Sequence, residues 1–73
     1  MPPRVLKFKE LTRLLEGLGL YLERQSGSHQ TWRHPDIPEP LTGVVWRGSE
    51  VKTPQWLRVR KWLARHQLLE EQN

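Results

Sequence analysis

The sequence predicts a small α+β domain with an α-β-β-β-α order, in which two helices pack on one face of a three-stranded antiparallel sheet. Three observations predict this class: a helical apolar stripe near the N-terminus, a period of two in the middle of the chain, and a second helical pattern near the C-terminus. A chain of 73 residues has room for one domain, over residues 1–73. A core of this size leaves such a domain only marginally stable.

The first helix is predicted from an amphipathic pattern that begins near residue 8. Its polar side carries Lys9, Thr12, Arg13 and Glu16, and its apolar stripe carries Phe8, Leu11, Leu14, Leu15 and Leu18. Gly17 and Gly19 follow the last turn of this pattern, where glycine commonly ends a helix.

The next segment alternates with period two, which is typical of strands. A first strand is predicted over residues 20–25, a turn over 26–28 and a second strand over 29–34. Successive side chains of a strand point to opposite faces of the sheet. One face of the second strand then carries His29, Thr31 and Arg33, and the other carries Gln30, Trp32 and His34.

The third strand is predicted over residues 41–47. The preceding segment, 35–40, contains Pro35, Pro38 and Pro40, and proline cannot donate to a strand ladder. We therefore expect that segment to be an extended or turning loop, and we expect Gly48 to end the strand.

The second helix is predicted to begin at Thr53-Pro54, because a threonine side chain can accept an early backbone N–H and proline suits the first helical position. It should end near His66 or Leu68. Its apolar side carries Trp56, Val59 and Leu63, and its opposite side carries Arg58, Lys61 and Arg65.

Composition limits the partners and the compartment. The chain has 12 Lys and Arg against 8 Asp and Glu, a formal charge of +4, and no cysteine. The charge favours a nucleic acid, an anionic membrane or an acidic protein as partner, and the missing cysteine excludes disulfides and fits a reducing cytosol. No run of about 18 apolar residues and no signal-peptide core occurs, so we expect a cytoplasmic protein that does not span a membrane.

The sequence QSGSHQTWRHP, residues 25–35, contains the candidate chemical group. Imidazole, with an unperturbed pKa of about 6.5, can accept or deliver a proton near neutral pH, so His29 is a candidate general acid or base. Gly27 allows positive φ, and the backbone N–H groups with the Ser28 hydroxyl can bind phosphate oxygens. The alternative is that Gly-Ser-His only forms a turn.

The other histidines have structural interpretations. His34 is predicted on the opposite face from His29, as a strand-end residue that orients the Pro35 loop. His66, near a helix C-terminus, is predicted to compensate the helix dipole or lie on the surface. The three histidines are widely spaced and form no HExxH pattern, so no metal site is predicted.

Basic and aromatic residues could hold a nucleic acid. The candidates for phosphate contacts are Arg24, Arg33 and Arg47 on strands and Arg58, Lys61 and Arg65 on the last helix. Of the four tryptophans, Trp32 and Trp56 are predicted in the core, whereas Trp46 and Trp62 are predicted to stack on bases or contact a protein partner.

The chain resembles the HicA family of toxins from bacterial and archaeal toxin–antitoxin pairs over roughly residues 7–36. The resemblance is carried by the Lys9–Glu16 register, Gly19-Leu20, Arg24-Gln25-x-Gly27-Ser28-His29 and Arg33-His34-Pro35-Asp36. The second half departs from it: Val44-Val45-Trp46 replaces the usual valine-proline-valine-histidine strand, and the glycine typical before the last helix is missing.

The resemblance implies a fold like the double-stranded-RNA-binding domain, an RNA-cleaving activity that arrests translation, and neutralisation by a cognate HicB-type antitoxin. It also implies that His29, which matches the histidine of the family's Gly-Ser-His motif, is catalytic. We therefore expect an endoribonuclease that cleaves mRNA without a metal or a small-molecule cofactor. The alternatives are a non-catalytic double-stranded-RNA-binding module, or a protein-interaction domain whose basic face meets an acidic partner.

Overall fold

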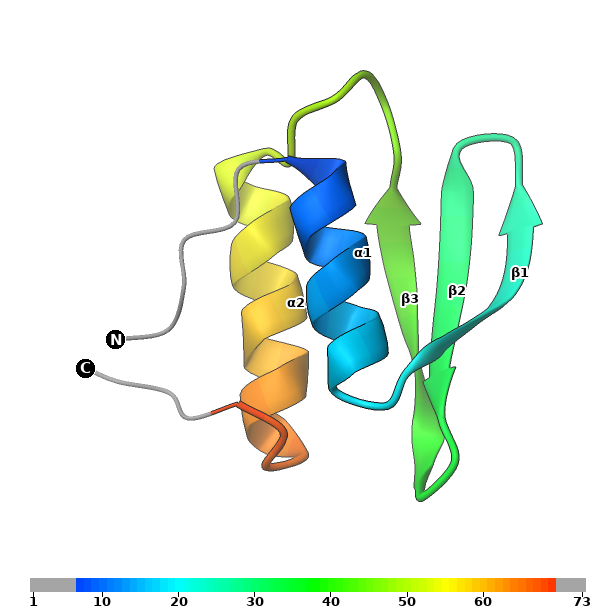
Figure 1. The fold of residues 1–73 in the computed structure, drawn as a ribbon, viewed down its shortest axis with the longest axis vertical. Coiled ribbons are helices and arrows are strands. Elements are labelled where there is room, and N and C mark those ends of the chain that lie inside the picture. Colours follow the sequence, from blue (N-terminus) through cyan, green and yellow to red (C-terminus); the bar gives the residue numbers. More distant parts are fainter. Residues whose placement is uncertain (1–6, 70–73) are drawn as a thin grey trace.

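The predicted order of elements is confirmed by a computed structural model that describes residues 7–69. The elements are α1 (Phe8–Gly17), β1 (Tyr21–Ser26), β2 (His29–His34), β3 (Ile37–Val45) and α2 (Thr53–Arg65). The strands form one antiparallel sheet in the order β1-β2-β3. The two helices lie side by side and run in the same direction, next to the sheet (Figure 1).

The helices cover one face of the sheet, and the core lies between the helices and that face. Buried apolar side chains come from both helices, from β2 and β3 and from the connections: Phe8, Leu11, Leu15, Leu20, Trp32, Leu41, Val44, Val51, Trp56, Val59, Trp62 and Leu63. On β2, Gln30 and Trp32 are buried, whereas His29 is exposed and Thr31 and Arg33 are half-buried. The predicted faces of β2 are therefore correct, and we call the uncovered side of the sheet the open face.

The end of α1 follows the predicted glycine signal. Leu20 N–H donates to Leu15 O at 2.9 Å and Gly19 N–H donates to Glu16 O at 3.0 Å, which is the hydrogen-bond pattern of a Schellman motif. Gly19 has φ +95°, a conformation that a residue with a Cβ rarely adopts. This motif satisfies the last carbonyl groups of α1 and directs the chain into β1.

A two-residue turn joins β1 to β2. Ser26 pairs with His29, so Gly27 and Ser28 form the turn, and Gly27 has φ +60°. A glycine with positive φ at the first central position is typical of the type II′ turn, whose twist suits a hairpin. The register of β1 against β2 shifts between Leu22 and Arg24.

The third strand begins earlier than predicted. Residues 37–40 belong to β3, and the strand ends at Val45 rather than at residue 47. The expectation of a loop over residues 35–40 is therefore wrong beyond the turn at Pro35-Asp36. Among the described residues, β3 is an edge strand and pairs with β2 only. On its other side no strand needs a backbone donor, so the N–H groups that Pro38 and Pro40 lack are not missed there.

The second helix has nearly the predicted bounds, but its N-cap differs from the prediction. It begins at Thr53, but its N-cap is Lys52, and no side chain accepts a hydrogen bond at that cap. It ends at Arg65 with His66 as C-cap, because Gln67 takes φ +62° and Leu68 N–H donates to Leu63 O at 2.8 Å. This second Schellman motif stops the helix before residue 68.

The tryptophans divide differently from the prediction. Trp32 and Trp56 are buried in the core, as predicted, with 2% and 7% of their surface exposed. Trp62 is only 5% exposed, so the expectation that it stacks on bases or contacts a partner is wrong. Trp46 is 41% exposed, so its contact with a base or a protein partner stays a prediction. None of the helices within residues 7–69 has the length and apolar character needed to cross a membrane.

Candidate functional site

The Gly27-Ser28 turn and the loop that follows β3 meet at the same end of the molecule (Figure 1). Trp46 N–H donates to Ser28 O at 2.7 Å, and His29 pairs with Val45 across the β2–β3 ladder. The loop after β3 is fixed in turn to α1, because Phe8 N–H donates to Ser49 O at 3.0 Å. Two segments that are far from the turn in the sequence therefore support it: residues 45–49 directly, and the start of α1 through residue 49.

Glutamine side chains connect this turn to the core. The indole Nε1–H of buried Trp32 donates to Gln30 Oε1 at 3.0 Å, and Gln30 Nε2 donates to Gln25 Oε1 at 3.3 Å. Gln25 Nε2 donates to Gly27 O at 2.9 Å. Gln30 is only 3% exposed, so its amide needs these partners, and the chain of bonds links the turn to a core tryptophan.

His29 is the first residue of β2 and is exposed. Because successive side chains alternate, it lies on the side opposite buried Gln30, which is the open face. Within residues 7–69 its imidazole has no hydrogen-bond partner and no ion pair. Both ring nitrogens can therefore meet a bound molecule, and the ring can accept a proton or donate one.

The turn itself offers backbone donors. Among the described residues, the N–H groups of Gly27 and Ser28 donate to no backbone carbonyl, whereas both of their carbonyl groups accept hydrogen bonds. Adjacent free N–H groups at a turn can bind an anionic oxygen. The sequence-predicted phosphate role of Gly27 and Ser28 is therefore compatible with the geometry.

Two of the predicted basic residues lie near the turn. Arg24 pairs with Thr31, two residues beyond His29 on the open face, and Arg47 follows Trp46 in the adjoining loop. Both are exposed, and neither has an ion pair with another residue of the described segment 7–69. These two guanidinium groups are the nearest candidates, by register and chain position, for contacts with an anion bound at the turn.

Arg33 shares the open face but is already paired. Its Nε donates to Glu23 Oε2 at 2.9 Å and its Nη1 donates to Pro38 O at 3.0 Å. It lies four residues beyond His29, which corresponds to about 13 Å along a strand. The structure therefore places it on the correct face but away from the turn.

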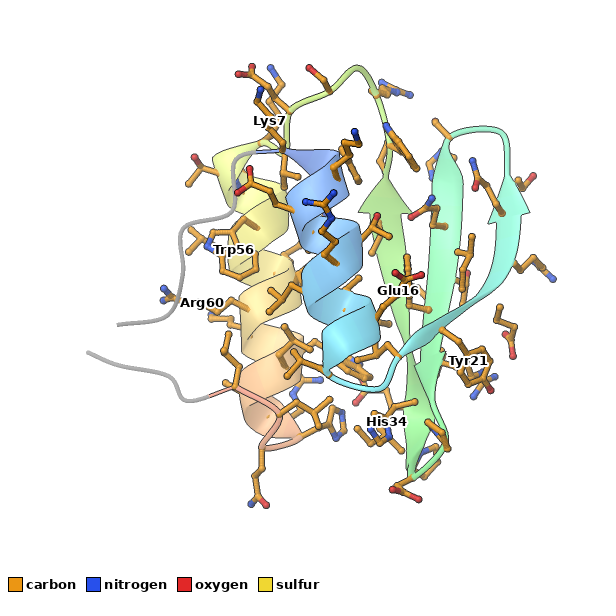
Figure 2. All side chains as sticks on the ribbon, in the orientation of Figure 1. Lys7, Glu16, Tyr21, His34, Trp56 and Arg60 are labelled. Carbon is orange, nitrogen blue, oxygen red and sulfur yellow. The ribbon has the colours of Figure 1, made fainter. Side chains whose placement is uncertain are left out.

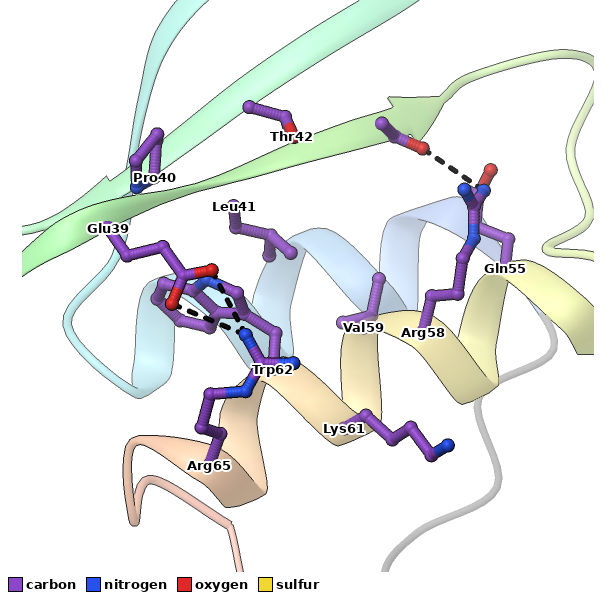
Figure 3. Close-up of a pocket in the computed structure, with 11 residues that line it drawn as sticks. Glu39, Pro40, Leu41, Thr42, Gln55, Arg58, Val59, Lys61, Trp62 and Arg65 are labelled. Carbon is purple, nitrogen blue, oxygen red and sulfur yellow. Dashed lines mark hydrogen bonds and ion pairs between the residues drawn. The ribbon is translucent and has the colours of Figure 1, made fainter.

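The basic residues of α2 form a separate site. Together with β3 they line a groove of about 260 Å³, drawn in Figure 3, whose lining includes Arg58, Lys61 and Arg65. Arg58 Nη2 donates to Gly43 O at 3.5 Å, and Lys61 points away from β3 (Figure 3). The groove lies between β3 and α2, whereas His29 lies on the open face, so these basic residues and the His29 imidazole are on different sides of the sheet.

Arg65 and His66 bind the same carboxylate in this groove. Arg65 Nη1 lies 3.0 Å from Glu39 Oε2, and His66 Nε2 lies 2.8 Å from Glu39 Oε1. The hydrogen bond from His66, aided by the positive charge of Arg65, holds the pKa of Glu39 below its ordinary value of 4.5. His66 therefore has a surface role near the helix end, as predicted, and Arg65 is partly neutralised.

His34 orients the chain after β2. Its Nδ1 accepts a hydrogen bond from Asp36 N–H at 3.1 Å, and its Nε2 would lie 3.0 Å from a Cβ at Gly19. Figure 2 shows it at the end of the sheet opposite the Gly27-Ser28 turn. These contacts agree with the predicted strand-end role. No group of three or more His, Asp or Glu side chains suited to hold a metal ion occurs within residues 7–69.

Sequence reasoning missed the glutamines that support this site. Gln55 is 8% exposed; its Oε1 accepts from Val45 N–H at 3.1 Å and its Nε2 donates to Val45 O at 3.2 Å. It thus fixes the residue that pairs with His29. The signal available in the sequence was a polar residue at a core-facing position, which Gln30 occupies on β2 and Gln55 occupies on α2, one residue before Trp56.

Comparison with known proteins gives one family. A family model described as "HicA toxin of bacterial toxin-antitoxin" matches residues 8–63, which is most of the chain. The match extends from the first residue of α1 to the buried part of α2 and includes the Gly27-Ser28 turn and His29. No curated protein and no solved structure matches the chain.

Proposed function

The chain belongs to the HicA toxin family of bacterial toxin–antitoxin systems, and on that premise we propose that it is a metal-independent endoribonuclease that cleaves mRNA in the cytoplasm and arrests translation. Family membership implies an antitoxin partner, and we propose a HicB-type protein in that role. His29 is the catalytic residue of this proposal. The observation that carries it is an exposed imidazole without a partner in residues 7–69, next to a turn with free backbone donors.

The proposed chemistry uses the nucleophile that RNA itself carries. The 2′-oxygen attacks the adjacent phosphorus, the bond from phosphorus to the 5′-oxygen breaks, and a 2′,3′-cyclic phosphate and a free 5′-hydroxyl result. One proton must leave the 2′-OH and one must reach the leaving 5′-oxygen. His29 either accepts the first proton or delivers the second, and neither transfer requires a metal.

The neighbouring groups have supporting roles in this proposal. The free N–H groups of Gly27 and Ser28, with the Ser28 hydroxyl, bind the phosphate oxygens. Arg24 and Arg47 contact flanking phosphates, because both guanidinium groups are exposed and unpaired within the described residues. Arg33 is held by Glu23, and Arg58, Lys61 and Arg65 lie along the α2 groove, so their contacts with RNA are expected to be weaker.

The first test is cleavage of a long single-stranded RNA in EDTA by the wild type and by His29→Ala. The wild type should cleave and leave 2′,3′-cyclic phosphate ends, and His29→Ala should be slower by about 10²- to 10⁴-fold. His34→Ala, the same change on the same strand at the far end of the sheet, should cleave at nearly the wild-type rate. RNA that remains bound but intact with the folded wild type would support the non-catalytic module instead.

A second test separates the two groups of basic residues. We expect Arg24→Gln or Arg47→Gln to lower the salt slope of binding to single-stranded RNA by about 0.7 for each lost phosphate contact. Arg65→Gln is the matched control, because Arg65 is already paired with Glu39 and should change the slope less. Equal decreases in the salt slope for Arg47→Gln and Arg65→Gln would show that RNA also contacts the α2 groove.

A further inference from the structure

Trp46 is the exposed member of the four tryptophans. It is 41% exposed, whereas Trp32, Trp56 and Trp62 are between 2% and 7% exposed. A large aromatic ring left in contact with water gives up the burial that would stabilise so small a domain. An exposed ring of this size is also a common feature of surfaces that bind a partner.

The ring is nevertheless held in one orientation. Its indole stacks on buried Phe8 with ring centroids 5.3 Å apart and an interplanar angle of 8°, and its Nε1–H donates to Gly48 O at 2.9 Å. Its backbone N–H donates to Ser28 O at 2.7 Å. One face of the indole is covered by Phe8, so the exposed surface lies on the remainder of the ring. A partner that binds there need not order the side chain first.

The position of Trp46 identifies the kind of partner. It follows Val45, which pairs with His29, and it precedes exposed Arg47. The same end of the molecule therefore offers a proton-transfer group on the open face, free backbone N–H groups at the turn, a cation in the adjoining loop, and a flat aromatic ring on the side that α1 covers. A nucleotide presents the matching set, a phosphate linked to a flat base.

We propose that Trp46 stacks on an unpaired base next to the phosphate at the Gly27-Ser28 turn, and that the substrate class is therefore single-stranded or looped RNA. A base inside a double helix is stacked on both faces, so the ring would have no face to meet. This inference rests on the proposed function, because it assumes that the phosphate at the turn belongs to RNA. Trp46 acts here as a binding residue that selects unpaired bases.

The test measures binding in the His29→Ala background, where the RNA stays intact. Two ligands of equal length are compared: a single-stranded oligoadenylate and a ribose-phosphate polymer that lacks bases. Trp46→Leu should weaken oligoadenylate binding by about 5- to 150-fold, which corresponds to about 1–3 kcal/mol for one stacked base, and should change binding of the base-free polymer less than about twofold. Trp46→Phe should retain part of the preference for bases.

Tyr21→Leu is the matched control. Tyr21 is 48% exposed and is the first residue of β1, away from the Gly27-Ser28 turn (Figure 2), so its loss should leave both affinities unchanged. Each variant is first compared with the wild type by its amide NMR spectrum and its thermal midpoint, because Trp46→Leu also removes the stack on Phe8.

The outcomes separate this inference from the proposed function. Unchanged oligoadenylate binding by folded Trp46→Leu, or equal losses for both polymers, would overturn base stacking while leaving the ribonuclease proposal in place. Weaker antitoxin binding with unchanged RNA binding would also overturn it and would make Trp46 a protein contact. Absence of RNA cleavage by the wild type and of RNA binding by His29→Ala would instead overturn the proposed function.

Discussion

Replacing Gln55 by leucine should destabilise the domain strongly although the two side chains have similar volumes. The amide of Gln55 bonds both the N–H and the C=O of Val45, at 3.1 and 3.2 Å, as a residue of a neighbouring strand would. With leucine, both backbone groups lose their partner beside a nearly buried position. Both bonds are only part-buried, so each loss costs about 1.5–2 kcal/mol, and the added apolar contact offsets about 1 kcal/mol of the sum.

The net expectation is a loss of about 2–3 kcal/mol in the free energy of unfolding, out of a total of about 4–11 kcal/mol for a domain of this length. At 4–8 °C per kcal/mol, the thermal midpoint should fall by about 8–24 °C. Calorimetry or circular dichroism measures this directly. Arg13→Leu, on the exposed side of α1, is the control and should change stability by less than about 0.5 kcal/mol.

A glutamate at position 55 tests the reasoning through pH. The ionised carboxylate keeps an acceptor for Val45 N–H but has no donor for Val45 O, whereas the protonated acid has one of each, as the amide does. Burial and the facing carbonyl should raise the pKa of this carboxyl in the folded state, so its stabilising form is present at low pH and lost as pH rises. The stability gap between Gln55→Glu and the wild type should therefore narrow as pH falls through the raised folded pKa, and should be smallest below about pH 4.3, the ordinary value for glutamate. A thermal midpoint of Gln55→Leu equal to that of Arg13→Leu, or a gap for Gln55→Glu that does not change with pH, would refute this account.

Three further changes test local features of the fold by thermal or chemical unfolding. Gly19→Ala should cost about 1–2 kcal/mol, because φ is +95° and the new Cβ would meet His34 Nε2 at 3.0 Å; an unchanged midpoint would contradict this. Gln67→Gly should gain about 0.5–1 kcal/mol, since relief at φ +62° exceeds the entropy cost of glycine; a loss would show that the Gln67 side chain stabilises the helix end. Because the pKa of Glu39 is lowered in the folded state, the ionised carboxylate contributes to stability above pH 4.5. This contribution is lost as pH falls through the lowered pKa of the folded state. Glu39→Gln lacks this contribution, so its stability deficit relative to the wild type should shrink in acid, and a deficit independent of pH would exclude the ionic contribution.

The sequence was sufficient for the elements whose pattern is local. The stripe of α1 and its glycine stop predicted both the buried face and the end of the helix, because these depend on residues within two turns of each other. The alternation of β2 predicted which side chains face the core. The Gly27-Ser28 turn and the exposure of His29 followed from the same register.

The errors arose where the tertiary environment decides. Pro38 and Pro40 argued against a strand, but the ladder of β3 has a partner on one side only, so the missing donors are tolerated. Trp62 was expected to stack on bases or contact a protein partner. Trp62 lines the groove between β3 and α2 and also belongs to the core cluster. The buried side of α2 is therefore wider than the predicted stripe of Trp56, Val59 and Leu63.

The position of His29 depends more on polar bonds than on burial, and this explains why the supporting residues could not be predicted. Every residue of β1 is exposed, so the strand that holds one side of the turn contributes little to the core. Hydrogen bonds hold the turn: the Gln25 side chain donates to Gly27 O, and Trp46 N–H donates to Ser28 O. Gln55 acts indirectly, because it bonds Val45, which pairs with His29. Hydrogen bonds of about 1 kcal/mol each can open locally without global unfolding. Substitutions at Gln25 should therefore disturb the site while the core of α1, β2 and α2 stays folded, because none of the apolar side chains that hold the helices on the sheet comes from β1.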